Sequence, residues 1–394
     1  MSIFCPSKDH NDEMWHGPRS GQEGAIEVFG ADEAFDITLL SSRLKSILAS
    51  PSKSSSSSPI YIEAPGVAPS SRTRTSTSPR SKSPTKALYD FLVPGHVDDE
   101  IAAILAGEKN GRLVKSAAKE VEKLRLYKSP NEIKVMRRAA DISSAAHSSV
   151  MRFCAPTSPS TPNPLLESSL VAHFEYQSAL AGSPRLAYVP VCASGSSGLT
   201  IHYTKNLLPL HSGDLVLLDA GCEYGGYASD ITRTFPVSGS FSSPQRDLYE
   251  AVLRVEKECI KLCTEGGRWT LDGLHRKSCE LMKGELGRLG FVLRGSEMER
   301  LLYPHFVGHP VGIDLHDCSS WGRDEEIKEN MVITIEPGLS IPPHPNFPKH
   351  FHNLVARVED EVLVRKEDYV VLSVNAPKEI VDVEATCQGL LEGR

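Results

Sequence analysis

The chain has 394 residues, with 40% hydrophobic residues, 24% charged residues and a formal net charge of -7. This length predicts two domains rather than one, and the composition is that of an ordinary globular protein. The negative charge argues against nucleic acid as the main partner, and no apolar run approaches the roughly 18–20 residues that a membrane-spanning helix needs. The nine cysteines are scattered without a CxxC pair, so neither a disulfide framework nor a zinc ribbon is predicted.

Residues 1–127 are predicted to form a first domain that contains Ser- and Pro-rich insertions at about 51–86. Such a composition buries too little apolar surface to become ordered, so we expect these insertions to be flexible. A short helix is expected in ITLLSSRLKSILAS, and YIEA is typical of a strand. The first residues, MSIFCPSKDHNDEMW, have the pattern of neither a secretory signal nor a mitochondrial presequence, so no targeting segment is visible.

Residues 128–394 are predicted to form a second domain that starts with a helix. Ser129 can cap this helix, Pro130 suits its first position, and Glu132 completes a capping box. A second helix is expected over residues 165–180. Later segments alternate between strand-like and helical patterns without strict β-α-β order, which indicates an α+β domain. The strand-like runs are residues 186–194, 213–221, 228–237, 331–341 and 356–374, and the helical runs are about 244–264 and 271–287.

Two aspartates, Asp219 and Asp230, flank the turn signal Tyr224-Gly225-Gly226-Tyr227. A hairpin centred between Tyr224 and Gly225 would place them directly opposite each other, at roughly 4.5–5.5 Å between Cβ atoms. Like charges at this distance repel, unless a cation such as a metal pair lies between them. A turn or capping role explains either Asp alone, but Asp219 follows four apolar strand residues, where an unpaired carboxylate is costly.

The segment PHFVGHPVGIDLHD contains His305, His309 and His316 within twelve residues, and its glycines allow close approach of the backbone. A single histidine is usually a packed or surface residue, but three in one segment raise the odds of a site. Glu336 and Glu359 lie in two later apolar strand runs, and a glutamate is rarely buried without a partner or a ligand.

An arginine partner could account for each glutamate alone. Together with the aspartates and a histidine they form a carboxylate-rich cluster with a nitrogen ligand. Such a ligand set suits Mn²⁺, with Co²⁺ or Zn²⁺ as alternatives.

Several of these segments closely resemble the aminopeptidase P branch of the pita-bread metallopeptidases. The matching stretches are DAGCEYGGYASDITRTFPVSG, the segment around His309, TIEPG, RVEDEVLV and IHYTKN around His202. The resemblance covers roughly residues 110–382 and, less strictly, 1–48. It implies a pita-bread catalytic domain preceded by a truncated α/β N-terminal domain. The Ser-rich insertion also resembles that of fungal mitochondrial intermediate-cleaving peptidases, which belong to the same branch.

The resemblance implies a metal-dependent aminopeptidase that releases one N-terminal residue from peptides or proteins, of the Xaa-Pro or intermediate-cleaving type. A hydroxide bridging two divalent metal ions would attack the scissile carbonyl. Glu336 would also relay protons, and His305 and His316 would stabilise the tetrahedral intermediate or hold the residue after the scissile bond. His202 would contact the substrate, and Arg357 would orient the carboxylates. The implied metal ligands are Asp219, Asp230, His309, Glu336 and Glu359.

Two features depart from the family pattern. Family members often carry an aromatic residue after EPGL, where this chain has Ser340, and the N-terminal domain is short. A catalytically inactive pita-bread binding protein and a prolidase that acts only on dipeptides therefore remain alternatives. The resemblance favours a mitochondrial location, with the cytoplasm as the other compartment, and a homodimer is compatible with it.

Overall fold

The structure, a computed structural model, describes residues 1–49, 60–62, 101, 104, 114–154 and 165–391. The chain divides into two compact units, residues 1–118 and 119–394, and each is described by itself. Apart from residues 60–62, the insertions predicted at about 51–86 lie outside the described residues. None of the helices in the described part of the chain is long and apolar enough to cross a membrane.

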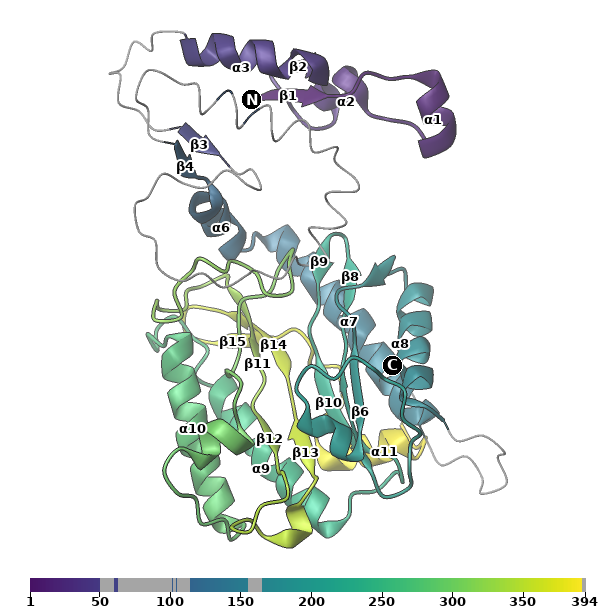
Figure 1. The fold of residues 1–394 in the computed structure, drawn as a ribbon, viewed down its shortest axis with the longest axis vertical. Coiled ribbons are helices and arrows are strands. Elements are labelled where there is room, and N and C mark those ends of the chain that lie inside the picture. Colours follow the sequence, from purple (N-terminus) through teal and green to yellow (C-terminus); the bar gives the residue numbers. More distant parts are fainter. Residues whose placement is uncertain (50–59, 63–100, 102–103, 105–113, 155–164, 392–394) are drawn as a thin grey trace. The chain divides into compact units, whose positions relative to one another are not determined.

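The described residues of the first unit form short helices and two parallel strand pairs (Figure 1). The predicted short helix near residue 45 and the predicted strand at residue 61 are both present. The strands are β1 (Ser2–Cys5), β2 (Glu33–Asp36), β3 (Ile60–Ile62) and β4 (Val114–Ser116), and the helices are α1 (His10–His16), α2 (Gly21–Glu27) and α3 (Leu40–Ala49), with a 3-10 turn at Ile37–Leu39.

The second unit combines helices with short antiparallel strands, so the predicted α+β class is correct. Its helices are α6 (Ala118–Leu126), α7 (Pro130–Phe153), α8 (Glu167–Leu180), α9 (Ser243–Ile260), α10 (Leu271–Arg288) and α11 (Ile380–Cys387). Its strands are β5 (Arg185–Leu186), β6 (Val191–Ser194), β7 (Leu215–Asp219), β8 (Cys222–Tyr224), β9 (Tyr227–Ala228), β10 (Thr232–Pro236), β11 (Val332–Ile335), β12 (Gly338–Ser340), β13 (Val355–Arg357), β14 (Asp360–Val364) and β15 (Tyr369–Val371).

The predicted start of α7 is confirmed. The side chain of Ser129 accepts a hydrogen bond from the backbone N–H of Glu132, whose carboxylate accepts one from the N–H of Ser129 at 2.6 Å. Met136, Ala140 and Ile142 of this helix are buried. A cap satisfies backbone N–H groups that a helix leaves without internal partners, so it fixes where α7 begins.

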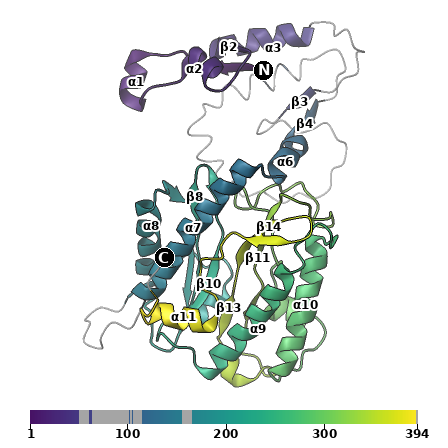
Figure 2. The same ribbon diagram turned by 180° about the vertical axis from the view of Figure 1, so that it is seen from behind.

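The strands of the second unit form two groups, each covered by a helix pair (Figures 1 and 2). Helices α7 and α8 pack beside the group that contains β6, β7, β8 and β10, while α9 and α10 lie beside β11, β12 and β13. A bridge between Thr232 and Glu359 joins the two groups. The two strand groups therefore meet at this bridge.

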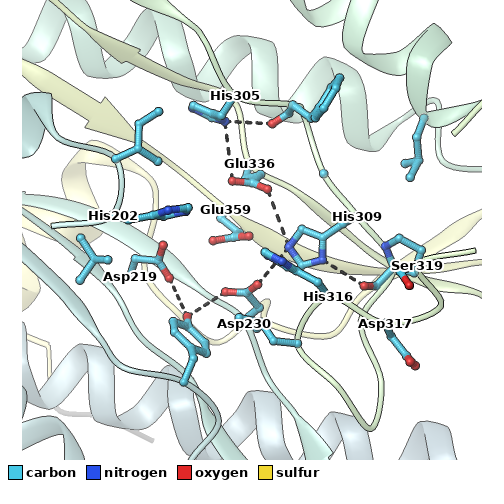
Figure 3. Close-up of a pocket in the computed structure, with 18 of the residues that line it drawn as sticks. His202, Asp219, Asp230, His305, His309, His316, Asp317, Ser319, Glu336 and Glu359 are labelled. Atoms are coloured by element: carbon cyan, nitrogen blue, oxygen red, sulfur yellow. Dashed lines mark hydrogen bonds and ion pairs between the residues drawn. The ribbon is translucent and has the colours of Figure 1, made fainter. Parts of the chain in front are cut away.

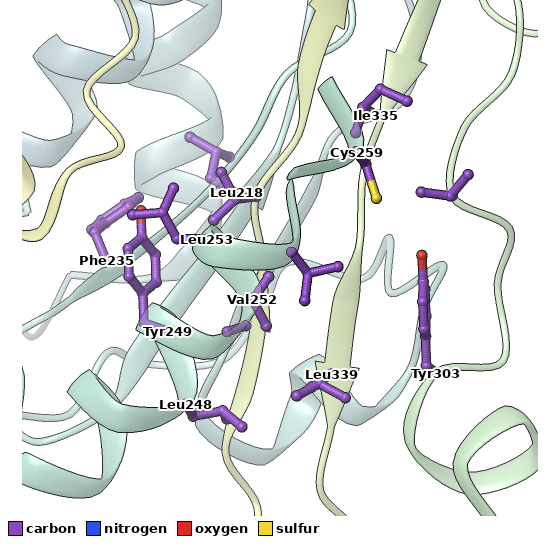
Figure 4. Close-up of a cluster of buried hydrophobic side chains, with 14 of the residues drawn as sticks. Leu218, Phe235, Leu248, Tyr249, Val252, Leu253, Cys259, Tyr303, Ile335 and Leu339 are labelled. Carbon is purple, nitrogen blue, oxygen red and sulfur yellow. The ribbon is translucent and has the colours of Figure 1, made fainter. Parts of the chain in front are cut away.

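The main hydrophobic core lies directly behind the strand ends (Figure 4). Leu218 and Ile335 are both fully buried, and each immediately precedes an acidic residue of the predicted site. Helix α9 covers them with Leu248, Tyr249 and Val252, which are also fully buried. Because close-packed side chains resist displacement, this core fixes the positions of the acidic residues at the strand ends.

The predicted register of the hairpin that carries the two aspartates is wrong by one position in its centre. The turn lies between Gly225 and Gly226, whose positive φ angles of 58° and 83° are those of a two-residue hairpin turn. The ladder that follows pairs Asp219 with Thr232, so Asp230 is not opposite Asp219 but lies between β9 and β10. Glycine tolerates the left-handed backbone conformation that both central positions of this turn require.

Candidate metal centre and active site

A pocket of about 650 Å³ opens where the two strand groups meet. All of the residues predicted for the site line it, and Figure 3 labels each of them except Arg357; they are His202, Asp219, Asp230, His305, His309, His316, Glu336, Arg357 and Glu359. They come from separate strand ends and loops, so it is the tertiary fold that brings them together. The remaining lining is largely apolar, with Ile201, Phe306 and Trp321 among its members.

Three of the predicted metal ligands converge most closely. Asp230, His309 and Glu359 each offer a donor atom, and these atoms lie within 4.8 Å of one another. Nε2 of His309 lies 3.3 Å from Oδ2 of Asp230 and 3.9 Å from Oε1 of Glu336. Glu336 is in turn 3.8 Å from Nδ1 of His305. The structure thus brings two carboxylate donors and one imidazole donor into a compact group, and Glu336 lies at its edge.

Asp219 joins the group through other side chains. Its Oδ2 pairs with Nη2 of Arg357, and its Oδ1 accepts a hydrogen bond from the hydroxyl of Tyr188 at 2.6 Å. The same hydroxyl lies 2.8 Å from Oδ1 of Asp230. The two aspartates are therefore neighbours around one phenol, although they are not the cross-strand pair that the sequence predicts.

The electrostatics of the pocket favour positive charge. Burial alone would lower the pKa of His309, but the hydrogen bond and charge of Asp230 and the charge of Glu336 outweigh it and raise that pKa to about 9. Burial and the neighbouring carboxylates of Asp230 and Glu336 raise the pKa of Glu359 well above its ordinary value. A cluster that holds a proton on histidine and resists ionisation of its acids has the electrostatics of a cation site, so these donors fit a divalent ion.

The pKa values of two further groups in the pocket are shifted in opposite directions. Burial raises the pKa of Glu336 to about 7, against the opposing effect of His309 and Arg357. Burial, assisted by Arg357, lowers the pKa of His305 to about 3, so that imidazole stays neutral. A carboxyl group with a pKa near 7 can both accept and return a proton at neutral pH.

Sequence reasoning missed three residues that support the site. Tyr188 bridges the aspartates, Oγ1 of Thr232 donates to Oε2 of Glu359 at 2.6 Å, and Oε1 of Glu361 accepts the backbone N–H of Asp230 at 2.7 Å. Thr232 and Glu361 each lie two residues after a predicted ligand in the sequence, but their spacing does not show which atoms they contact. Groups that hold metal ligands in place in this way tune both their orientation and their affinity.

Comparison with known proteins places the chain in a family. Residues 134–366 match the model of metallopeptidase family M24, and residues 1–55 match that of the aminopeptidase P N-terminal domain. Intermediate cleaving peptidase 55 of Saccharomyces cerevisiae is 38% identical, covering 98% of this chain and 70% of that protein. Xaa-Pro aminopeptidase 3 of Rattus norvegicus is 35% identical over the same shares of the two chains. A mitochondrial intermediate cleaving peptidase 55 of Arabidopsis thaliana is 35% identical, covering 98% of this chain and 69% of that protein.

Solved structures agree with this placement. The crystal structure of the yeast peptidase superposes with a TM-score of 0.79 at 36% identity, covering 98% of this chain and 81% of that chain. Aminopeptidase P of Escherichia coli, in a variant bound to substrate, superposes with a TM-score of 0.81 at 28% identity, covering 98% and 82%. The pita-bread fold expected from the sequence is thereby confirmed. The chain belongs to metallopeptidase family M24 and is a metal-dependent aminopeptidase.

Proposed function

We propose that the chain binds two divalent metal ions and releases one residue at a time from the N-terminus of peptides or proteins. The observation that carries this proposal is the convergence of Asp230, His309 and Glu359 at the pocket, within reach of Asp219 and Glu336. Asp219 would serve one ion, His309 and Glu336 the other, and Asp230 and Glu359 both. The oxygen-rich donor set with one imidazole favours Mn²⁺, although Co²⁺ and Zn²⁺ also accept such ligands.

Divalent ions held there supply Lewis acidity, which polarises a carbonyl and lowers the pKa of water. The protein supplies the rest. Glu336, which lies 3.8 Å from His305 and 3.9 Å from His309, would take and return the proton of the attacking water. His305 lies beside Glu336, and its neutral ring donates from Nδ1 to the carbonyl oxygen of Phe306 at 2.9 Å, so its Nε2 is free to accept a hydrogen bond from the substrate. Arg357 holds Asp219 through a side chain that is only 7% exposed, and so keeps that carboxylate oriented.

The pocket supports a substrate with an apolar first or second residue. Ile201, Leu271, Phe306 and Trp321 line it, while His202 and His316 provide polar contacts. Ser340, which lines a small second pocket together with His305, stands where members of this branch often carry an aromatic residue. We propose cleavage of the Xaa-Pro or intermediate-cleaving type, supported by the names of the yeast and rat relatives.

We also propose that the protein works in mitochondria. The support is the Arabidopsis relative, whose name gives that compartment. Fractionation of cells that express the protein from its own gene would test it, and recovery outside the mitochondria would contradict the proposal.

The decisive experiment is a mass-spectrometric screen of peptides that differ in their first two residues, with Mn²⁺ present. Release of single N-terminal residues is expected from the wild type and not from Glu336→Gln, which keeps the size of the side chain but loses its proton chemistry. Cleavage of dipeptides alone would identify a prolidase. Binding of Mn²⁺ with no release from any peptide would identify a binding protein and overturn the proposal.

A further inference from the structure

The pocket wall that follows His316 is held from behind by helix α6. Residues 314–320 form a loop, here called the 314–320 loop, and its members His316, Asp317, Cys318 and Ser319 line the pocket (Figure 3). The imidazole rings of His316 and His309 lie 4.3 Å apart between centroids. Any displacement of this loop therefore changes where His316 stands relative to the metal centre.

Three residues at α6 hold the loop, and we call them the α6 clamp: Glu122 and Arg125 of the helix, and Lys128 just after it. Nη2 of Arg125 lies 2.6 Å from Oδ2 of Asp314 and 2.5 Å from Oδ1 of Asp317. Nζ of Lys128 lies 3.9 Å from the other oxygen of Asp317. Asp317 and Lys128 are each only 1% exposed at the side chain, so their pairing is shielded from solvent and salt.

Glu122 adds hydrogen bonds to the far end of the loop. Its Oε2 accepts the backbone N–H of Ser320 at 2.8 Å and also the hydroxyl of that residue. Its backbone carbonyl oxygen accepts the thiol of Cys318 at 3.3 Å. The α6 clamp thus contacts the loop both before and after Asp317 in the sequence. Asp317 itself directly follows His316.

The loop needs such support because its backbone is strained. Cys318 has a φ of 54°, a left-handed conformation that a residue with a Cβ adopts at a cost. Such conformations persist only where surrounding contacts enforce them, and they gather at functional sites. Here Oδ1 of Asp317 accepts the N–H of Cys318 at 2.9 Å, and the same oxygen pairs with Arg125. The side chain that anchors the loop to α6 is therefore also the one that stabilises the strained turn.

Gly312 shows how tightly the segment is packed over this anchor. A Cβ at that position would collide with Oδ2 of Asp317 and would lie 3.2 Å from Cε of Lys128. The segment between His309 and His316 therefore closes directly over the buried pair. Asp317, Lys128 and the segment between His309 and His316 are thus packed together.

We propose that Arg125 is a positioning residue of this aminopeptidase, which acts through Asp317 to hold His316 against the substrate. This inference rests on the proposed role of His316 in substrate contact. Arg125 itself does not line the pocket. It lies on α6, which opens the second unit and carries none of the predicted site residues.

The test is a double-mutant cycle between Arg125 and His316 in the Mn²⁺-loaded enzyme. The substrate is the peptide that the wild type cleaves fastest in the screen above. Arg125→Gln is expected to lower kcat/KM at least tenfold in the wild-type background but no more than twofold in the His316→Ala background. Non-additivity of this kind shows that the two residues act as a unit. An equal loss in both backgrounds would overturn the proposal, as would a His316→Ala variant with unchanged kcat/KM.

The matched control is Lys123→Gln, on the same helix. Lys123 is 65% exposed, and within the described part of the chain its ion pair is with Glu120 alone, so the same change of charge and shape should leave kcat/KM within twofold of the wild type. Affinity for Mn²⁺, measured by calorimetry, should be unchanged in Arg125→Gln, because Arg125 contacts none of the proposed ligands. Arg125→Lys keeps the charge that pairs with Asp317 and should recover part of the lost activity.

Hydrogen exchange gives a readout that does not depend on activity. Arg125→Gln should speed exchange of the backbone amides of Cys318 and Ser320, whereas Lys123→Gln should not. Unchanged exchange in Arg125→Gln would overturn the clamp whatever the enzyme cleaves. If the wild type cleaves no peptide, the proposed function fails and the exchange result alone decides whether α6 holds the loop. Should Arg125→Gln fail to fold, Glu122→Gln is expected to show a smaller effect in the same direction.

Discussion

The phenolic oxygen of Tyr188 lies 2.6 Å from Oδ1 of Asp219, and its hydroxyl is the link between that carboxylate and the rest of the cluster. Burial, together with the charges of Asp219 and Asp230, raises the pKa of Tyr188 well above its ordinary value, so the hydroxyl keeps its proton. Because it has one proton to donate, it orients one of the two carboxylates at any moment.

Replacing Tyr188 by phenylalanine should therefore loosen the metal centre without unfolding the protein. We expect Tyr188→Phe to weaken Mn²⁺ affinity by about 10–100-fold, the usual effect of losing a group that holds a ligand in place. Calorimetric titration of chelator-treated protein measures this directly. Tyr227→Phe is the matched control, since its hydroxyl donates to Glu132 at 2.7 Å outside the pocket. Equal affinities in the two variants would contradict the role of Tyr188.

Removing metal should lower the stability of the folded state as well as abolish activity. An ion that binds only the native state stabilises it by about 2.7 kcal/mol when its free concentration is 100 times Kd. We therefore expect chelation to lower the melting temperature and Mn²⁺ to restore it, as measured by differential scanning calorimetry. Asp230→Asn should show no Mn²⁺-dependent shift, whereas Asp247→Asn, an exposed change on α9, should behave like the wild type.

His147 should make the protein sensitive to acid. Its side chain is fully buried, donates from Nε2 to the carbonyl of Ala220 at 3.0 Å, and has its pKa lowered by burial to about 3. The unfolded chain takes up this proton near pH 6.5 and the folded chain does not, so the free energy of unfolding falls as the pH falls from about 6.5 to 3. At most, the loss is about 1.4 kcal/mol per pH unit.

His147→Gln keeps a donor but cannot titrate in this range, so its free energy of unfolding should fall less steeply with acid. Urea unfolding of chelator-treated wild type and variant at pH 7, 6, 5 and 4 measures the two slopes. Parallel slopes would show that the burial of His147 does not contribute to acid sensitivity.

The core behind the aspartates should tolerate little loss of volume. Leu218 is fully buried one residue before Asp219. Leu218→Ala is expected to lower the free energy of unfolding by about 2–5 kcal/mol, because it removes buried methyl groups and leaves a cavity. Leu207→Ala, at a side chain that is 67% exposed, should change it by less than about 0.5 kcal/mol. Urea unfolding of both variants checks the contrast.

The sequence was most informative where a carboxylate, which is costly to bury, lies in an apolar run. Asp219, Glu336 and Glu359 end or interrupt buried strands, and the energetic cost of a carboxylate at such a position marks each of them as a candidate ligand. The helix start at Ser129 could also be predicted from the sequence, because a capping box is a local pattern. Their grouping in one pocket agrees with the predicted site, while the assignment of each residue to a metal stays a prediction.

What the sequence could not supply were contacts between distant segments. Tyr188, Glu361 and Arg125 each act on a residue far along the chain, and no spacing rule connects such pairs. The hairpin register failed for a more local reason. Both glycines of Gly225-Gly226 adopt positive φ, which moves the turn centre by one residue and the partner of Asp219 from Asp230 to Thr232.

The bridge between Thr232 and Glu359 has a consequence for how the protein is made. During synthesis the N-terminal segments leave the ribosome first, so Asp219 and Asp230 are present long before Glu359. Arg357, which pairs with Asp219, is synthesised almost together with Glu359. Until then Thr232 lacks its bridge to Glu359, and the pocket lacks one wall. The pocket of a nascent chain is therefore still incomplete when Asp219 and Asp230 have been made, and it can close only once the segment that carries Arg357 and Glu359 has also left the ribosome.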